Sequence, residues 1–128
     1  MDQHKQTDKL IYYIEDNPAN LRLMEQLINR WTSFKFLSAS EPVAGIEEIK
    51  QHSPDIILLD INLPNISGYE VLQHLRENNI CPDAPVFAVT ANAMETDTQK
   101  IKDAGFDEYI SKPVDIETLI EKLNNAIE

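Results

Sequence analysis

A chain of 128 residues, of which 42% are hydrophobic and 26% are charged, is long enough to bury one core and too apolar to be disordered. Its formal net charge of −11 argues against nucleic acid and acidic membranes as partners, because phosphate groups attract basic surfaces. The first residues lack the apolar core of a signal peptide, no segment reaches the roughly 20 apolar residues that cross a bilayer, and a lone cysteine cannot form an internal disulfide, so we expect a cytoplasmic protein without direct membrane contact.

The N-terminal part of the chain predicts a strand, a helix, a second strand and a second helix. Leu10–Ile14 is an apolar run typical of a buried strand, and Pro18–Trp31 has apolar residues at helical spacing. Alternating apolar and polar residues from Phe34 favour a half-exposed edge strand, and a short helix is expected over 41–52. The apolar stripe of the first helix is Leu21, Met24, Leu27, Ile28 and Trp31, and the second helix is expected to turn Val43, Ile46 and Ile49 inward.

The middle of the chain continues this alternation. Residues 55–60 form a continuous apolar run, the mark of a central parallel strand that is covered on both faces. A helix is expected from about Gly68, and residues 85–90 predict another fully buried strand. A helix with few apolar residues follows over 94–104, and Gly105 is its expected end. The residues expected to be buried in the helix after Gly68 are Val71, Leu72 and Leu75.

The C-terminal part completes five strand–helix units, with a strand over 106–111 and a last helix. Strict alternation predicts an α/β fold with a doubly wound, five-stranded parallel sheet and right-handed crossovers. Residues 1–8 are expected to be a polar tail or linker, and 9–128 a single domain. In such sheets ligands bind beyond the carboxyl ends of the strands. The apolar stripe of the last helix is Ile116, Leu119, Ile120, Leu123 and Ile127.

Charged and polar residues occupy the predicted carboxyl ends of the central strands. Glu15 and Asp16 follow the first strand, Asp60 ends the third, Thr90 ends the fourth and Lys112 follows the fifth. Adjacent parallel strands lie about 4.8 Å apart, so the three carboxylates are expected to be close neighbours. Two carboxylates about 4 Å apart repel by about 4 kcal/mol at an effective dielectric constant of about 20, so either one carboxyl is protonated or a cation lies among them. Oxygen ligands without histidine or thiolate favour Mg²⁺ or Mn²⁺.

Each of these residues also has an ordinary structural explanation. Glu15 and Asp16 could simply favour the start of the following helix through its dipole. Asp60 could be a turn residue, Lys112 a surface lysine and Thr90 a β-branched strand residue. A shared site explains better why all five are expected at one end of one sheet.

The combination is suited to phosphoryl transfer. A carboxylate such as that of Asp60 can attack phosphorus and form an aspartyl phosphate. The reaction needs the charge on the equatorial oxygens neutralised, and a cation, the ammonium of Lys112 and the hydroxyl of Thr90 could supply that.

Four motifs occur in order and in matching strand contexts: YIEDN, ILLDINLPNISGYEVL, VTANA and YISKPVD. Together they resemble a response-regulator receiver domain over nearly the whole chain, of the type often found in hybrid sensor histidine kinases. The resemblance implies a flavodoxin-like (βα)5 fold with strand order 2-1-3-4-5. It also implies a two-component or phosphorelay protein, either a single-domain response regulator or the receiver of a hybrid kinase.

The resemblance implies a role for each acidic residue of the site. Asp60 would be the phosphoacceptor and a metal ligand, and Asp16 would bind Mg²⁺ directly. Glu15 would act mostly through a metal-bound water, and Asn62 would offer its backbone carbonyl. Many receivers have Asp where Glu15 stands, so the extra methylene is expected mainly to adjust metal affinity.

The resemblance also implies a switch. Lys112 would contact the phosphoryl group, and a cis bond to Pro113 would hold that lysine in place. Thr90 would be the hydroxyl that turns towards the phosphoryl group, and Tyr109 the aromatic residue whose ring moves between outward and inward rotamers. The expected output face combines the helix over 94–104, the fifth strand and the last helix.

The implied partner is a histidine kinase or a histidine phosphotransfer domain. The domain would catalyse its own phosphorylation and dephosphorylation as a signalling protein, and its oligomeric state stays open, a phosphorylation-dependent dimer included. Two other functions compete with this interpretation. A phosphatase with an aspartate nucleophile often has a second Asp two residues later, where this chain has Asn62. A docking module that keeps only the fold would not need an intact site.

Overall fold

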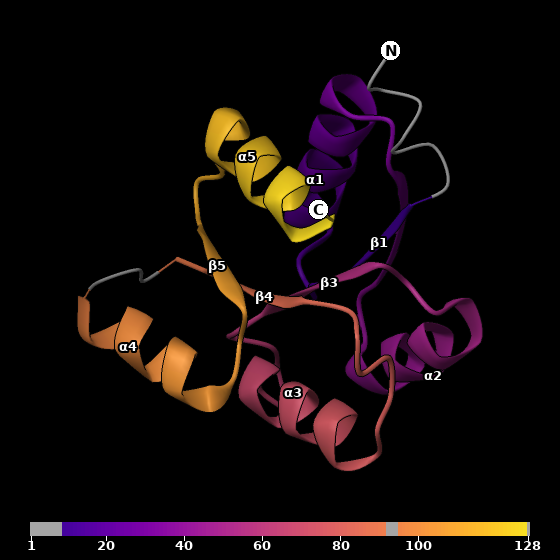
Figure 1. The fold of residues 1–128 in the computed structure, drawn as a ribbon, viewed down its shortest axis with the longest axis vertical. Helices are drawn as coiled ribbons and strands as arrows, with labels where there is room; N and C mark the ends of the chain where they lie inside the picture. Colours follow the sequence, from indigo (N-terminus) through magenta and orange to yellow (C-terminus); the bar gives the residue numbers. More distant parts are fainter. Residues whose placement is uncertain (1–8, 92–94, 128) are drawn as a thin grey trace.

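The computed structural model describes residues 9–91 and 95–127, in which five strands alternate with five helices (Figure 1). The predicted alternation is confirmed. The elements are β1 (Leu10–Ile14), α1 (Pro18–Trp31), β2 (Lys35–Ala39), α2 (Pro42–His52), β3 (Ile56–Asp60), α3 (Gly68–Glu77), β4 (Val86–Thr90), α4 (Glu95–Ala104), β5 (Glu108–Ser111) and α5 (Ile116–Ile127).

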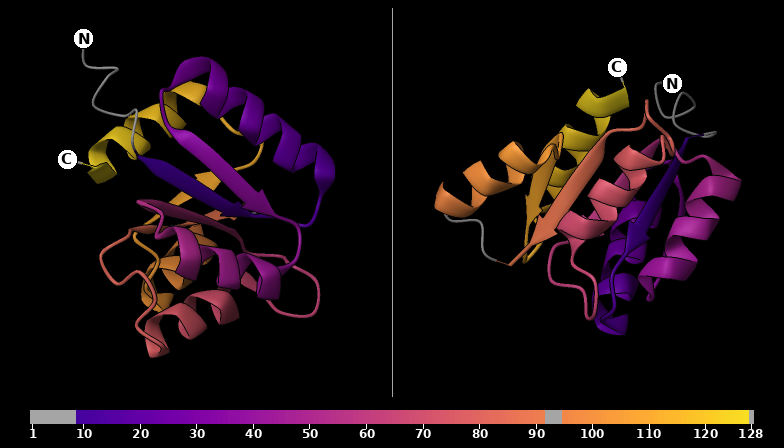
Figure 2. Two further views of the ribbon diagram at one scale, coloured as in Figure 1. Left: turned by 90° about the vertical axis from the view of Figure 1, so that its right-hand side faces the viewer. Right: turned by 90° about the horizontal axis from the view of Figure 1, so that it is seen from below.

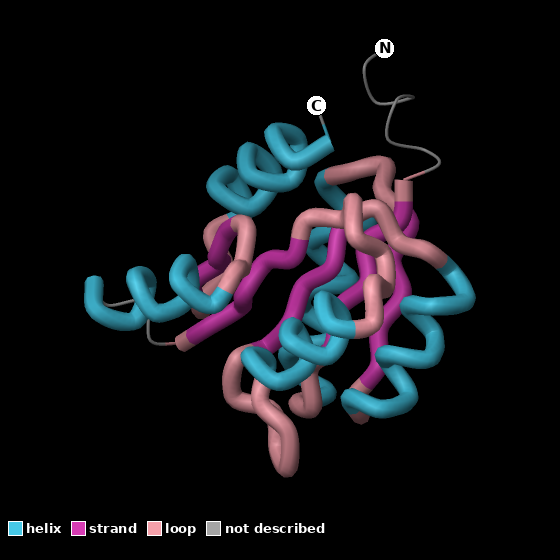
Figure 3. Tube along the Cα trace, turned by 60° about the horizontal axis from the view of Figure 1, so that its bottom comes forward, coloured by secondary structure: helices cyan, strands magenta, loops and turns pink. Residues whose placement is uncertain are grey.

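The strands form one parallel sheet in the order β2-β1-β3-β4-β5. Helices α1 and α5 cover one face of the sheet and α2, α3 and α4 cover the other, as Figure 1 and the turned views in Figure 2 show. The tube in Figure 3 shows the same three layers, with the strands between the helices. The predicted doubly wound α/β fold and its strand order are therefore confirmed. Because β1 and β3 are neighbours, the ends of these two strands meet.

Alternate residues of β1, β3 and β4 enter two separate cores, one on each face of the sheet. In β1, Ile11 and Tyr13 pack with residues of α1 and α5, whereas Tyr12 and Ile14 pack with residues of α2, α3 and α4. All residues of β3 and β4 are buried. The two continuous apolar runs are thus central strands covered on both faces, as predicted.

Helices α1 and α3, which follow β1 and β3, have hydrogen-bonded N-terminal caps. The side-chain oxygen of Asn17 accepts hydrogen bonds from the N–H groups of Ala19 and Asn20 at the start of α1, which has a proline in its first turn. At the start of α3, Ser67 and Glu70 form a capping box. These caps end the loops that follow β1 and β3.

Val43 does not point inward, so that prediction is wrong. Its side chain is 63% exposed. The buried stripe of α2 includes Pro42, Ile46 and Ile49 instead. Successive residues of a helix lie about 100° apart around its axis, so Val43, which follows Pro42, points out of the buried stripe.

Trp31 lies on the predicted stripe of α1 but is 53% exposed. The buried residues of this helix are Met24 and Ile28, and Trp31 is its last residue, one turn further on. Its ring contacts the guanidinium of Arg30, whose Cζ lies 5.3 Å from the ring centroid. Helical spacing therefore located the stripe but not the point at which the core ends.

The predicted element boundaries shift by one or two residues. β3 and β4 each begin one residue later than predicted, and β5 begins two residues later. Glu41 is the N-cap of α2 rather than its first residue. Met94, the predicted start of α4, lies outside the described residues, and Gly105 after the helix has a φ of +106°, in the left-handed region that ends helices. Within residues 9–91 and 95–127, no helix combines the length and the apolar character needed to cross a membrane.

Candidate functional site

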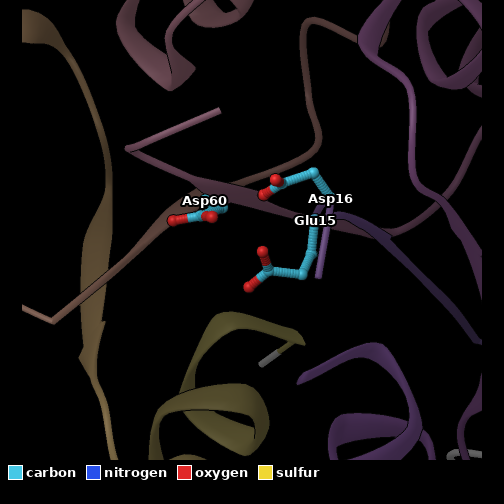
Figure 4. Close-up of side chains that lie close together, drawn as sticks. All are labelled: Glu15, Asp16 and Asp60. Carbon is cyan, nitrogen blue, oxygen red and sulfur yellow. The ribbon is translucent and has the colours of Figure 1, made fainter. Parts of the chain in front are cut away.

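The carboxyl ends of β1 and β3 bring three carboxylates together (Figure 4). Glu15 and Asp16 follow β1, and Asp60 is the last residue of β3. The register of the two strands pairs Ile14 with Leu59, so the three acidic residues lie at the same level of the sheet. One carboxylate oxygen from each lies within 4.8 Å of the other two.

The site is buried except at one carboxylate. Glu15 is 1% exposed and Asp60 is 3% exposed, whereas Asp16 is exposed. Thr90, at the end of β4, is 3% exposed. Among the described residues, Glu15, Asp60 and Thr90 are the buried polar or charged side chains, and all three lie at the carboxyl ends of strands. Asp16 therefore marks the side from which solvent or a ligand reaches the site.

Lys112 brings a positive charge between two of the carboxylates. Its Nζ lies 2.8 Å from Oε1 of Glu15 and 3.5 Å from Oδ1 of Asp60. Its backbone N–H donates to the carbonyl of Thr90 at 2.8 Å, which joins the ends of β5 and β4. The peptide bond between Lys112 and Pro113 is cis. The structure thus brings the predicted lysine into the acidic cluster.

Burial and the hydrogen-bonded neighbour Glu15 raise the pKa of Asp60 to about 6, although Lys112 acts in the opposite direction. Burial opposes the ionisation of Glu15, but hydrogen bonds from Asp60, from Lys112 and from the backbone of Asn17 outweigh it and lower the pKa of Glu15. As the pH falls, the pair therefore takes up its first proton on Asp60. Above a pH of about 6, the three carboxylates beside one ammonium carry an excess of two negative charges.

The donor set and its charge fit a hard divalent cation. Glu15, Asp16 and Asp60 supply carboxylate oxygens, which Mg²⁺ and Mn²⁺ prefer. In the part of the chain that the structure describes, no histidine or cysteine belongs to this cluster. The residues present therefore suit Mg²⁺ or Mn²⁺ and not zinc.

Glu15 also receives hydrogen bonds from residues to which the sequence analysis assigned no part in the site. The hydroxyl of Tyr13 donates to Oε1 at 2.9 Å, and Nδ2 of Asn20 donates to the same oxygen at 3.3 Å. The backbone N–H of Asn17 donates to Oε2 at 3.2 Å. Residues two apart on a strand point to the same face, so the place of Tyr13 two residues before Glu15 was a usable signal. Asn20 carried no such signal, because its contact with Glu15 depends on how α1 packs against the sheet.

A hollow of about 370 Å³ opens beside the carboxylates, between the loop after β3 and α4. Its lining includes Asn62, Thr90 and Tyr69, and Nζ of Lys100 lies 4.9 Å from the centroid of the Tyr69 ring. Asn62 is exposed, and its backbone N–H donates to Oδ1 of Asp60 at 3.2 Å. The role of the Asn62 carbonyl as a metal ligand stays a prediction.

Tyr109, the predicted aromatic switch, lies half-buried on β5 and is tied to α5 by one lysine. Nζ of Lys122 lies 4.3 Å from the centroid of the Tyr109 ring and donates to the Tyr109 carbonyl at 2.6 Å. The same ammonium forms an ion pair with Glu108 at 3.3 Å. Movement of the ring stays a prediction.

A cavity of about 530 Å³ lies at the opposite end of the sheet, where the strands begin. Lys50, Asp55, Cys81 and Asp83 are among the residues that line it, and none of the clustered carboxylates does so. The grouping of charges, rather than the size of a cavity, therefore identifies the candidate site.

Known proteins resemble this chain in sequence and in fold. A family model described as "Response regulator receiver domain" matches residues 11–124. The polar-differentiation response regulator DivK of Brucella anthropi is 34% identical over 119 residues, which cover 93% of this chain and 96% of that protein.

Solved structures of other proteins have the same fold. The receiver domain of the sensor histidine kinase PA1611 from Pseudomonas aeruginosa, solved with a magnesium ion coordinated in its active-site cleft, is 26% identical with a TM-score of 0.83, over 93% of this chain and 97% of that one. The chemotaxis protein CheY4 of Vibrio cholerae has the same fold at 18% identity, with a TM-score of 0.83 over 92% of this chain and 98% of its own.

Proposed function

This chain belongs to the response regulator receiver domain family, and we propose that Asp60 is the residue on which it accepts a phosphoryl group. One arrangement carries this proposal: a buried carboxylate at the end of β3 with two further carboxylates and the ammonium of Lys112 beside it. The phosphodonor would be a phosphohistidine on a histidine kinase or on a histidine phosphotransfer domain.

Transfer would begin with attack of one Asp60 oxygen on the phosphorus of the phosphohistidine. The O–P bond forms as the P–N bond breaks, the electron pair of that bond stays on the imidazole nitrogen, and the nitrogen takes up a proton from water. Asp60 has to be ionised for this attack, and its pKa of about 6 keeps it so at neutral pH and above. Attack of water on the aspartyl phosphate would later release inorganic phosphate and restore the carboxylate.

Glu15, Asp16 and Asp60 would hold Mg²⁺ or Mn²⁺, with Asn62 contributing its backbone carbonyl. When bound, the cation would neutralise negative charge on the oxygens of the transferring group. Lys112 would pair with another of these oxygens. To do so, it would move away from Glu15, from which it is separated by 2.8 Å.

We assign the response to phosphorylation to Thr90 and Tyr109. The Thr90 hydroxyl would donate to the phosphoryl group and draw the end of β4 towards it. Tyr109 is paired with Ala88, two residues before Thr90 on the neighbouring strand, so a shift at the end of β4 would reach the aromatic ring. The output face would consist of α4, β5 and α5. A coupling of about 1–3 kcal/mol would change the affinity for an output partner about 5- to 150-fold.

The surface next to Lys112 suits a protein as phosphodonor. A small hollow of about 130 Å³ is lined by Leu23, Met24 and Val114, next to Lys112 and Pro113. Leu23 is 46% exposed. An apolar side chain of the donor protein could cover Leu23 there while its phosphohistidine reaches the neighbouring carboxylate.

The test is incubation with acetyl phosphate and Mg²⁺, followed by mass spectrometry of the intact chain. The parent protein should gain the mass of one phosphoryl group, and it should gain none when Mg²⁺ is chelated. Asp60→Asn should gain none in either case. Asp83→Asn is the matched control, because Asp83 is an exposed acidic residue at the opposite end of the sheet. Equal labelling of Asp60→Asn and the parent would contradict the assignment.

A further inference from the structure

Two side chains from different elements converge on one oxygen of Glu15. The Tyr13 hydroxyl lies 2.9 Å from Oε1, and Nδ2 of Asn20 lies 3.3 Å from it. Tyr13 belongs to β1 and is 1% exposed, and Asn20 belongs to the first turn of α1 and is half-buried. Because a strand and a helix supply the two donors, they fix the carboxylate from two directions.

Lys112 is a third side-chain donor to the same oxygen, at 2.8 Å. Under the proposed function it would turn to the phosphoryl group on Asp60. Glu15 would then keep the hydrogen bonds from Tyr13, from Asn20 and from the backbone of Asn17. A carboxylate that is 1% exposed needs such donors, since a buried charge without partners is costly.

We propose that Tyr13, supported by Asn20, is a positioning residue that holds Glu15 ready for the divalent cation. This inference rests on the proposed function, because it requires Glu15 to serve that cation. A Glu side chain has one more rotatable bond than Asp, and a hydrogen bond to one of its oxygens removes freedom that cation binding would otherwise have to remove. Partners of this kind orient metal-binding groups and tune their affinity.

The Tyr13 hydroxyl also has a structural use that needs to be distinguished. A buried tyrosine needs a hydrogen-bond partner, and Glu15 provides one. Burial and the charge of Glu15 raise the pKa of Tyr13, so its hydroxyl keeps the proton and acts as a donor. A hydroxyl with a structural role alone would contribute to stability and leave the affinity for the cation unchanged.

The experiment is calorimetric titration of the intact chain with Mg²⁺. Loss of a partner that orients a metal ligand typically lowers metal affinity 10- to 100-fold, so Tyr13→Phe should weaken Mg²⁺ binding about tenfold. Asn20→Ala should weaken it by a smaller factor, since its hydrogen bond is longer. Tyr12→Phe is the matched control: its hydroxyl donates to Glu48 at 2.6 Å, on the other face of the same strand, and its loss should leave the Mg²⁺ affinity unchanged.

The Tyr13→Phe substitution can also be measured in the Glu15→Asp protein. In Glu15→Asp the shorter side chain withdraws the carboxylate from the Tyr13 hydroxyl, so the added Tyr13→Phe substitution should have little effect on Mg²⁺ affinity. A full tenfold loss in that background would count against the inference.

The outcomes separate this inference from the proposed function. Mg²⁺ binding by the parent with unchanged affinity in a folded Tyr13→Phe protein would overturn the positioning role alone. If Tyr13→Phe does not fold, unchanged affinity in Asn20→Ala would overturn it instead. No Mg²⁺ binding by the parent would overturn the metal part of the proposed function, and this inference with it.

Discussion

Lys112 is paired with Glu15 more closely than with Asp60: its Nζ lies 2.8 Å from Oε1 of Glu15 and 3.5 Å from Oδ1 of Asp60. The ammonium therefore compensates the charge of both buried carboxylates at once. It also lies where it repels any dication bound by the same residues. Lys112 thus stabilises the acidic site without a cation and opposes the cation when it enters.

Replacing Lys112 by methionine should strengthen Mg²⁺ binding while slowing phosphorylation. Methionine keeps a similar stem but removes the charge, and a dication and an ammonium about 6 Å apart in a water-like dielectric repel by about 1.4 kcal/mol, or about tenfold in affinity. Calorimetric titration should show the tighter binding. Acetyl phosphate labelling should be slower, because the ammonium that would pair with a phosphoryl oxygen is lost. Weaker Mg²⁺ binding in Lys112→Met would contradict this balance.

Asp60→Asn should stabilise the metal-free protein at neutral pH. A carboxyl whose pKa is raised to about 6 binds its proton more tightly in the folded state, so its contribution to stability is present below about pH 4 and is lost as the pH rises through 6. Asparagine has no ionisable carboxyl, so Asp60→Asn does not lose stability in this pH range. Urea unfolding with a chelator should show a gain of about 1–3 kcal/mol at pH 7.5, and a gain about one third as large at pH 4.5.

Two checks accompany that measurement. Glu15, whose pKa is lowered, has the opposite sign: its contribution is present above the pKa of the unfolded chain and is lost only in more acidic solution. It therefore does not cause a loss between pH 4.5 and 7.5. Saturating Mg²⁺ should bring the parent closer to Asp60→Asn at pH 7.5. A difference between the two proteins that does not grow with pH would contradict the raised pKa of Asp60.

Lys122→Gln should destabilise the protein and alter the surroundings of Tyr109. Lys122 contacts the Tyr109 ring, its carbonyl and Glu108 and is 21% exposed, so we expect the free energy of unfolding to fall by about 1 kcal/mol. Urea unfolding measures the loss, and NMR shifts of the Tyr109 ring report its environment. Lys50→Gln is the control, because the exposed Lys50–Glu47 pair should contribute less than about 0.5 kcal/mol. Equal effects of the two substitutions would show that Lys122 does not hold the ring.

Gly68→Ala should damage the site from the start of α3. A Cβ at Gly68 would lie 2.5 Å from the backbone oxygen of Asp60, so the strand end and the helix have to separate, at a cost of about 1–3 kcal/mol. Gly45→Ala is the comparison, because its Cβ would meet Cδ1 and Cγ1 of the buried Ile14 at 2.7 and 2.9 Å and would disturb the core without meeting the backbone of Asp60. Denaturation should show a loss of stability in both variants, whereas Mg²⁺ titration should show a large effect of Gly68→Ala and a small effect of Gly45→Ala. Unchanged Mg²⁺ affinity in Gly68→Ala would refute the link to Asp60.

Local patterns predicted most of the fold because they depend on short-range periodicity. The continuous apolar runs predicted the central strands β3 and β4, which end at Asp60 and Thr90. Val43 shows the limit of this reasoning. A proline next to it took the buried position, and spacing by threes and fours allowed either residue.

By itself, the sequence determined the order of the elements, the parallel sheet and the presence of three carboxylates, a hydroxyl and an ammonium at its carboxyl end. These follow from periodicity and from the rule that parallel strands end together. Only the tertiary structure decided that Lys112 pairs with Glu15, 97 residues away in the chain, and that Tyr13 and Asn20 reach the same oxygen. The contacts of Lys112 and Asn20 depend on rotamers and on distances of a few ångströms between elements, which no local pattern encodes, and the spacing of Tyr13 and Glu15 indicates a shared face but not a hydrogen bond.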